Sequence, residues 1–260
     1  MVSSSRRPRP VRDMPAGFGL APEGSLRRSV SLLRAFRLEQ TDPDYFYGLL
    51  AADSVREVSR FVDLRGALLL DVGGGPGYFA DAFASVGARY AAVEADAGEL
   101  AAAGLPGRNT VLASGLRLPF ADGSVDVCYS SNVLEHVPSP EDMADEMVRV
   151  TRSGGTVVLS WTTWYSPWGG HETSPWHYLG GRYAADRYER RFGKRPKNDF
   201  GTTMYAAHAG PMLGWARSHP RAELVAAYPR YHPSWLRWMA RVPGLREAAV
   251  WNMVLVLTVR

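Results

Sequence analysis

The stretch LLLDVGGGPGYFADAF, residues 68–83, joins an apolar run, an acid, a glycine-rich loop and an amphipathic segment in immediate succession. Its start, Leu68–Val72, predicts a buried strand, and residues 78–86 predict a helix, so the glycines form the loop between them. Glycines let a ligand approach the backbone, and the helix that follows directs free N–H groups towards a carboxylate. The stretch therefore predicts a ligand-binding loop at the carboxyl edge of a sheet.

Outward from this loop, short apolar strands alternate with amphipathic helices. The later strands are expected at residues 90–94, 111–113, 125–130, 155–161, 222–229 and 252–259, and the helices at 25–40, 43–61, 78–86, 97–103 and 140–150. Such alternation predicts an α/β doubly wound sheet with helices on both faces. The segment 162–220 interrupts the alternation and is rich in aromatic residues, glycine and histidine, so we expect it to be a cap over the site.

Composition sets broad limits on the protein class. The chain has 260 residues, of which 46% are hydrophobic and 22% charged, which suits one large globular domain. Residues 1–24 are rich in Ser, Arg, Pro and Gly, and we expect a disordered tail there. No apolar run approaches the length of a membrane helix and the start lacks a signal-peptide core, so a cytoplasmic location is expected. Cys128 is the single cysteine and no Cys/His spacing fits a zinc site, so we expect neither a disulfide nor a metal.

The net charge of +4 is unevenly distributed along the chain. Residues 1–40 hold 8 arginines against 3 acids, so the remainder is close to neutral. Within that remainder, residues 182–197 carry 7 basic and 2 acidic side chains. This segment is either a solvated face or a contact for an acidic substrate or polyanion.

Spacing separates three nucleotide-binding alternatives for the glycine loop. A phosphate-binding loop needs Gly-Lys-Ser/Thr, but the Gly-Lys at Gly193 is followed by Arg195. A dinucleotide fingerprint needs a third Gly or Ala where Tyr78 stands. The pattern D-x-G-G-G-x-G, with Glu94 ending the next strand, resembles the class I S-adenosylmethionine-dependent methyltransferases. The stretch ASGLRLPFADGSVDVCYSSNVLEHV, residues 113–137, is similar to the same family in order and spacing.

The resemblance covers residues 64–161 and the final two strands, and as a whole the chain resembles uncharacterised actinobacterial methyltransferases of type 11. It implies a Rossmann-like sheet of seven strands, the last antiparallel, in a methyltransferase domain spanning residues 25–260 with two N-terminal helices at 25–63. It implies S-adenosyl-L-methionine as the cofactor. The residues that it assigns to cofactor binding are Asp71 at the ammonium, Gly73, Gly75 and Gly77 at the methionine part, Glu94 at the ribose hydroxyls, Ser114 and Gly115 at adenine, and Asn132 below the sulfonium. Many relatives carry Asp where this chain has Ser114.

Methyl transfer to an oxygen needs a group that removes a proton. His136 follows the fourth strand and is either that base or a structural residue. His171, paired with Glu172, is the first choice of base and orienter within the cap. The stretch 161–181 holds 4 of the 8 tryptophans, which suits either an acceptor pocket or a small aromatic core.

These observations favour methyl transfer to a small molecule, with oxygen as the expected acceptor atom. One alternative is an RNA or protein methyltransferase that uses the basic segment 182–197. The residues Ser131–Leu134 do not form the Asn-Pro-Pro-Tyr type of loop, which makes nucleic acid an unexpected partner. A second alternative is a non-catalytic binding module that keeps the fold. The sequence leaves the acceptor and the oligomeric state open.

Overall fold

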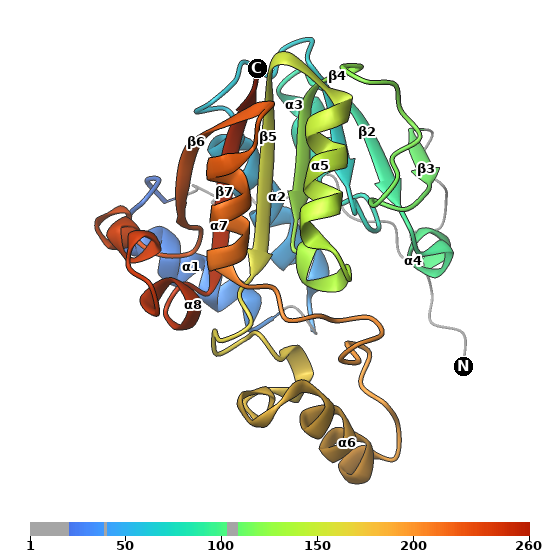
Figure 1. Ribbon diagram of the computed structural model, residues 1–260, viewed down its shortest axis with the longest axis vertical. Coiled ribbons are helices and arrows are strands. Elements are labelled where there is room, and N and C mark those ends of the chain that lie inside the picture. Colours follow the sequence, from blue (N-terminus) through green and yellow to red (C-terminus); the bar gives the residue numbers. More distant parts are fainter. Residues whose placement is uncertain (1–20, 39–40, 103–108) are drawn as a thin grey trace.

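The computed structural model describes residues 21–38, 41–102 and 109–260, and its centre is one sheet (Figure 1). Within these residues the sheet has seven strands in the order β3-β2-β1-β4-β5-β7-β6. Their bounds are β1 (Leu68–Val72), β2 (Arg89–Glu94), β3 (Thr110–Leu112), β4 (Val125–Ser131), β5 (Thr151–Thr162), β6 (Ala222–Pro229) and β7 (Asn252–Val259). β7 runs antiparallel to β5 and β6, while β1 to β5 pair in parallel. The predicted fold class is confirmed.

The strand order places the site-bearing loops at one edge. The chain builds β1, β2 and β3 outward in one direction and then returns to β4 on the other side of β1. Ligands of open α/β sheets bind at this kind of reversal, outside the carboxyl ends of the strands. The loops after β1 and β4 therefore meet where the sequence places its glycine loop and its first candidate base.

Helices cover both faces of the sheet, which explains why its central strands are apolar on both sides. The α-helices are α1 (Leu26–Phe36), α2 (Pro43–Val58), α3 (Ala80–Ser85), α4 (Ala97–Ala102), α5 (Pro140–Val150), α6 (Gly181–Phe192), α7 (Ala209–Ser218) and α8 (Leu245–Ala248). The short 3-10 helices are η2 (Leu134–His136), η3 (His171–Thr173), η4 (Trp176–Leu179) and η5 (Ser234–Arg241). α5 and α7 form one buried layer with the sheet, and α2 and α3 form the other (Figure 1).

The N-terminal helices α1 and α2 are tied to the sheet by buried charges. Arg28 of α1 donates from Nε to Asp53 of α2 at 2.7 Å and from Nη1 to the carbonyl oxygen of Arg230 at 2.7 Å. Arg230, which follows β6, donates to Ser131 Oγ at 2.7 Å, and its Nε lies 3.4 Å from Glu57 Oε2. We call α1, α2 and these contacts the N-terminal cover.

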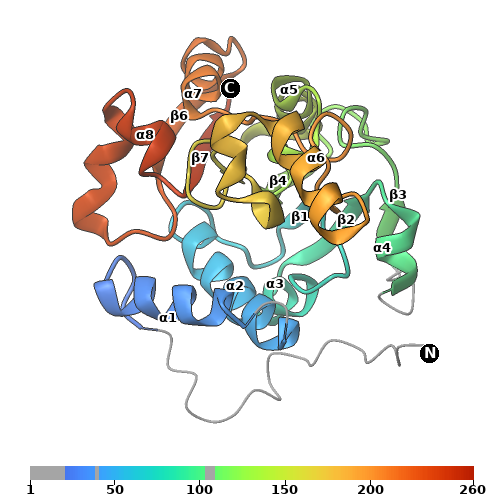
Figure 2. The same cartoon turned by 90° about the horizontal axis from the view of Figure 1, so that it is seen from below.

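The cap is shorter than the sequence predicts. Segment 163–208 leaves the end of β5, carries η3, η4 and α6, and projects beyond the carboxyl edge of the sheet (Figure 1). Residues Ala209–Ser218, which the prediction included in the cap, form α7, because Met212 and Leu213 are buried against the sheet. Seen from below, the cap and the N-terminal cover lie on opposite sides of the carboxyl edge (Figure 2).

Two further expectations concern the start of the chain and the presence of a membrane-spanning helix. Most of the predicted disordered tail, residues 1–20, lies outside the described residues. Ala21, however, is buried, and its carbonyl oxygen accepts a hydrogen bond from Arg56, so the described fold begins before Ser25. Within the described part of the chain, no helix has the length and apolar character needed to cross a membrane.

Candidate active site

The glycine loop after β1 faces open space. Gly75 and Gly77 have left-handed backbone angles, with φ of +51° and +84°, and a Cβ built on either would meet no atom within 4 Å. Gly73 is different, since a Cβ there would lie 2.3 Å from Val133 of the segment after β4. Gly73 therefore allows the two loops to pack together, whereas Gly75 and Gly77 leave room for a ligand against the backbone.

Asp71 lies beneath this loop at the end of β1 and is only 2% exposed. Its carboxylate accepts a 2.6 Å hydrogen bond from the Tyr90 hydroxyl. Burial raises the pKa of Asp71 to about 7, against the effect of the Tyr90 hydrogen bond and with a smaller contribution from the negative charge of Glu94. A cation placed near Asp71 would favour the charged form, so the geometry suits an ammonium ligand.

Glu94 links the end of β2 to the glycine loop. Its Oε2 accepts from the backbone N–H of Gly75 at 2.9 Å, and its Oε1 accepts from those of Ala95 and Asp96 at 2.8 and 2.9 Å. These bonds fix both carboxylate oxygens beside the loop. Oε2 keeps a lone pair for a further donor such as a ribose hydroxyl, whereas the N–H groups of Ala95 and Asp96 occupy both acceptor sites of Oε1.

The remaining expected cofactor residues follow β3 and β4. Ser114 is exposed, and its Oγ accepts from the N–H of Leu116 at 3.2 Å. Gly115 packs closely, because a Cβ there would lie 3.1 Å from Val72 and 3.2 Å from the Met143 sulfur. Asn132 has φ of +58°, and its side-chain oxygen accepts from Asn252 of β7 at 2.7 Å. The side chain of Asn132 is thus held by the neighbouring strand.

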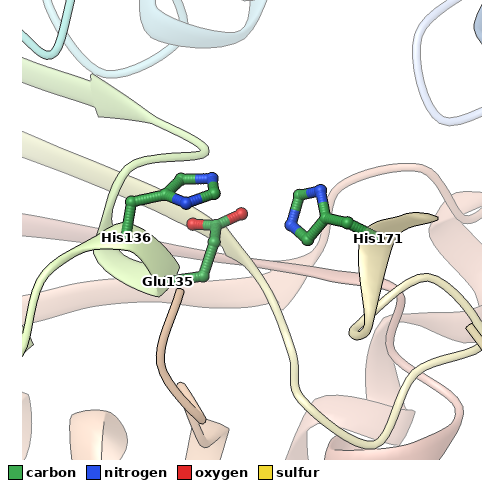
Figure 3. A group of neighbouring side chains, drawn as sticks. All are labelled: Glu135, His136 and His171. Atoms are coloured by element: carbon green, nitrogen blue, oxygen red, sulfur yellow. The ribbon is translucent and has the colours of Figure 1, made fainter. Parts of the chain in front are cut away.

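The fourth strand and the cap bring two histidines and a carboxylate together (Figure 3). His136 comes from η2 and His171 from η3, and their ring centroids are 5.2 Å apart. Glu135 lies between the two imidazoles in Figure 3 and is 2% exposed. Its Oε1 accepts from the N–H of Thr162 at 3.0 Å, while its Oε2 has no hydrogen-bond partner among the described residues.

His171 occupies an unusual backbone position at the start of η3. It is a non-glycine residue with φ of +46°, and its Nε2 is buried without a partner in the described part of the chain. Burial lowers the pKa of His171 below its usual value, and the nearby Glu135 carboxylate partly offsets that effect. The imidazole is therefore neutral near pH 7, with one ring nitrogen able to accept a proton.

Glu172, the expected partner of His171, is directed elsewhere. Its carboxylate accepts from the backbone N–H of Asn198 at 2.9 Å and from the Asn198 side chain at 2.6 Å. The acid beside His171 is Glu135, which the sequence interpretation did not single out. The available signal was its position in the LEH triplet at the end of the fourth strand, next to a histidine already chosen as a candidate.

The aromatic stretch of the cap serves two structural purposes. Trp164 and His177 are buried and pack edge to face with their ring centroids 5.3 Å apart, which matches the small-core alternative. Trp168 is partly exposed and packs against Phe36 of α1 at 5.1 Å. That contact joins the cap to the N-terminal cover.

His208, His219 and the basic segment contribute no side chain to the group of Glu135, His136 and His171. His208 lies 3.7 Å from Glu247, and His219 lies 3.2 Å from Asp145. On the basic segment, Arg195 forms ion pairs with three acids, and Arg187 stacks on the Trp176 ring at 3.8 Å. Arg195 and Arg187 are therefore engaged within the cap.

Comparison with known proteins agrees with this geometry. Residues 70–159 match a family model described as a methyltransferase domain. An uncharacterized methyltransferase of Mycolicibacterium gilvum is 54% identical over 92% of this chain and 96% of its own length. One from Mycolicibacterium vanbaalenii is 53% identical, with 94% and 99% covered.

Solved structures share the fold at low sequence identity. A geranyl diphosphate methyltransferase in complex with S-adenosylmethionine superposes with a TM-score of 0.55 at 15% identity, covering 92% of this chain and 93% of its own. An S-adenosylmethionine-dependent methyltransferase from Mesorhizobium loti gives a TM-score of 0.55 at 18% identity, with 82% and 98% covered.

Proposed function

The chain belongs to the family of S-adenosylmethionine-dependent methyltransferases, and from that premise we propose that it methylates a hydroxyl oxygen of a small molecule. The observation that carries the proposal is the group of Glu135, His136 and His171. It lies directly after β4, at the edge where the glycine loop opens. Lone pairs of a carboxylate and an imidazole remain unused there.

The described residues fit the cofactor. Gly75 and Gly77 leave open space above the loop, and Asp71 supplies a buried carboxylate without a cationic partner. We assign Asp71 to the ammonium. We assign Glu94 to the ribose hydroxyls, because its Oε2 accepts one backbone N–H and keeps a lone pair for a hydroxyl donor. Gly73, Ser114, Gly115 and Asn132 complete the proposed contacts.

When bound, S-adenosylmethionine supplies an electrophilic methyl group whose bond to sulfur breaks as the bond to the acceptor oxygen forms. The protein's part is to align the acceptor and remove its hydroxyl proton. His171 Nε2 is the free nitrogen that takes this proton, and Glu135 stabilises the resulting imidazolium by its negative charge. His136 lies on the opposite side of Glu135 from His171 (Figure 3).

A small-molecule acceptor agrees better with the cap than a polyanion does. Trp168 and Tyr165 of the cap present exposed aromatic surface, as an apolar acceptor would need. Within the basic segment, Arg195 and Arg187 are engaged by neighbouring side chains, which makes these two less available to a polyanion.

Calorimetric titration with S-adenosylmethionine and with its demethylated product tests the cofactor assignment, with NAD as the control. We expect both sulfur compounds to bind and NAD not to bind. Failure of both to bind would contradict the assignment of Asp71, Glu94 and the loop.

A panel of hydroxyl, amine and carbon acceptors with isotopically labelled methyl donor tests the acceptor atom. Mass spectrometry of the product should locate the label on oxygen. A label on nitrogen or carbon would contradict the proposed deprotonation.

A further inference from the structure

The group of Glu135, His136 and His171 has the composition of a metal centre. Each residue offers one ligand atom, and these atoms all lie within 4.8 Å of one another. Two imidazoles and one carboxylate are a frequent ligand set for divalent transition metals. Figure 3 shows the two rings on either side of the Glu135 carboxylate.

Two of the candidate ligand atoms are buried and lack a partner. Glu135 Oε2 and His171 Nε2 form no hydrogen bond with the described residues, although Glu135 is 98% buried. A buried polar atom without a partner costs about 1–3 kcal/mol, more if charged. A cation between them would satisfy both lone pairs at once.

Hydrogen bonds to backbone groups orient the side chains of His136 and Glu135, as second partners commonly orient metal ligands. His136 Nδ1 lies 2.8 Å from the carbonyl oxygen of Thr203, so the neutral ring carries its proton on Nδ1 and keeps a lone pair on Nε2. Glu135 Oε1 accepts from the N–H of Thr162 at 3.0 Å, which leaves Oε2 as the free oxygen. Thr203 belongs to the cap and Thr162 is the last residue of β5, so the cap and β5 together orient the two side chains.

Only a small movement of the three ligand atoms would bring them into contact with one ion. Three points within 4.8 Å of one another lie no more than about 2.8 Å from a common centre. Bonds from zinc to imidazole nitrogen or carboxylate oxygen are about 2.0–2.2 Å long. Each ligand atom would therefore move by less than about 1 Å.

We propose that Glu135, His136 and His171 bind one divalent transition-metal ion of the Zn²⁺ or Co²⁺ type. Mg²⁺ and Ca²⁺ fit less well, because they prefer oxygen ligands. Three protein ligands leave coordination positions open, as in catalytic and unlike structural zinc sites. The sequence did not suggest this site, because two ligands are adjacent and the third belongs to the cap, a spacing that matches no zinc motif.

With an ion bound, an open coordination position would be available to the acceptor hydroxyl, and this part of the inference rests on the proposed function. A metal-bound hydroxyl loses its proton more readily, because the cation stabilises the oxyanion. With the ion bound, His171 Nε2 would be a metal ligand in place of its role as proton acceptor in the metal-free protein, and the hydroxyl proton would pass to water. The oxyanion then forms the new bond to the methyl carbon, and the thioether leaves with the electron pair of the broken bond.

Titration of chelator-treated full-length protein with Zn²⁺ and with Co²⁺ tests the site. We expect one ion per chain, and a Co²⁺ visible spectrum with nitrogen and oxygen ligation. His171→Gln and Glu135→Gln should each weaken binding at least tenfold. His219→Gln, which changes a histidine paired with Asp145 outside the site, should bind as the wild type does.

Circular dichroism of each variant separates loss of a ligand from loss of the fold. Wild-type protein that binds neither ion, or folded variants that bind as tightly as the wild type, would overturn the metal site. Acetohydroxamate should shift the Co²⁺ spectrum, and no shift would overturn the open coordination positions.

Titration of the metal-free protein with S-adenosylmethionine keeps the two proposals apart. Cofactor binding without metal binding would overturn this inference and leave the methyltransferase assignment intact. Metal binding without cofactor binding would support the metal site and contradict the assigned cofactor residues.

Discussion

The N-terminal cover and the cap flank the same edge of the sheet but are held by different forces. In the cover, Arg28 and Arg230 are buried and bonded to buried acids and hydroxyls. In the cap, the main ion-pair centre is Arg195, which is exposed along with its partners Asp186 and Glu189. The cover thus depends on charges that cannot be left unpaired, whereas the cap is fixed largely by aromatic packing and by its contacts with Glu135 and His136.

This difference assigns separate tasks to the two regions. Buried ion pairs do not add much net stability over an apolar core, but removing one partner is strongly destabilising. The N-terminal cover should therefore be sensitive to the loss of any one of its buried charges. The cap contributes His171 to the candidate site and should tolerate changes on its outer surface.

The largest expected effect is a loss of stability when a buried charge of the N-terminal cover is removed. Arg230→Ala should lower the free energy of unfolding by about 3–5 kcal/mol, because Glu57 is left as a buried charge without its cation. Urea unfolding measures the change. Arg195→Ala on the cap is the matched control, and it should have little effect since exposed ion pairs contribute little. Equal losses in both variants would remove the distinction between the two regions.

A change at the cap's inner surface should affect turnover and leave the fold intact. His171→Gln removes the proposed proton acceptor or metal ligand, and we expect methyl transfer to slow by about 100-fold or more. Steady-state kinetics and cofactor titration are the measurements, with cofactor affinity expected to stay within about twofold. A variant that loses stability and retains turnover would make His171 a packing residue.

A variant at the glycine loop lies outside both the N-terminal cover and the cap, and it tests cofactor binding. Glu94→Ala removes a carboxylate from the glycine loop, and cofactor binding should weaken by about 1.5–3 kcal/mol, the range for hydrogen bonds to charged groups. Calorimetric titration gives the value. Unchanged affinity would contradict the ribose assignment, and a loss of fold would indicate that Glu94 mainly holds Gly75.

The last expected effect is a pH dependence, and it concerns a buried acid that has no cationic partner among the described residues. The pKa of Asp71 is raised to about 7 by burial, whereas the unfolded chain has the ordinary value of 3.8. The folded protein thus retains a proton that the unfolded chain releases, so the contribution of Asp71 to stability falls as pH rises from about 4 to 7. The slope is at most about 1.4 kcal/mol per pH unit.

Unfolding of wild type and Asp71→Asn across this pH range measures that slope. The wild type should lose stability relative to the variant as pH increases, and parallel curves would contradict the raised pKa. Cofactor binding at pH 6.5 should release a proton, because an ammonium favours the charged carboxylate. Titrations in buffers of different ionisation enthalpy detect this release.

Local sequence patterns predicted the sheet well and the candidate site in part. The bounds of β1, β6 and β7 match the predicted ranges, because apolar runs between turn residues determine them. Residues 209–218 were assigned to the cap, since a glycine and a proline near the start of α7 obscure its helical pattern. His136 could be predicted as a candidate because it lies in the short segment after the fourth strand, and a local pattern can reveal such a position.

Long-range contacts could not be predicted in the same way. The approach of His171 to Glu135 depends on the path of the whole cap, and the pairing of Glu172 with Asn198 depends on a loop beyond α6. Adjacent residues such as His171 and Glu172 seldom face each other, so the expected pair was a weak inference from spacing. The burial of Arg230 likewise requires α1, α2, β4 and β5 to be assembled around it.

The bond from Arg28 to the carbonyl oxygen of Arg230 spans most of the chain and has a consequence for synthesis on the ribosome. Arg28 and Asp53 can pair as soon as the first two helices emerge. Glu57 must wait for Arg230, by which time nearly the whole sheet has been translated. Chains arrested before that point carry an acid on α2 whose Arg230 partner has not yet been made, so the buried ion pairs of the N-terminal cover are completed only after β6 has been translated.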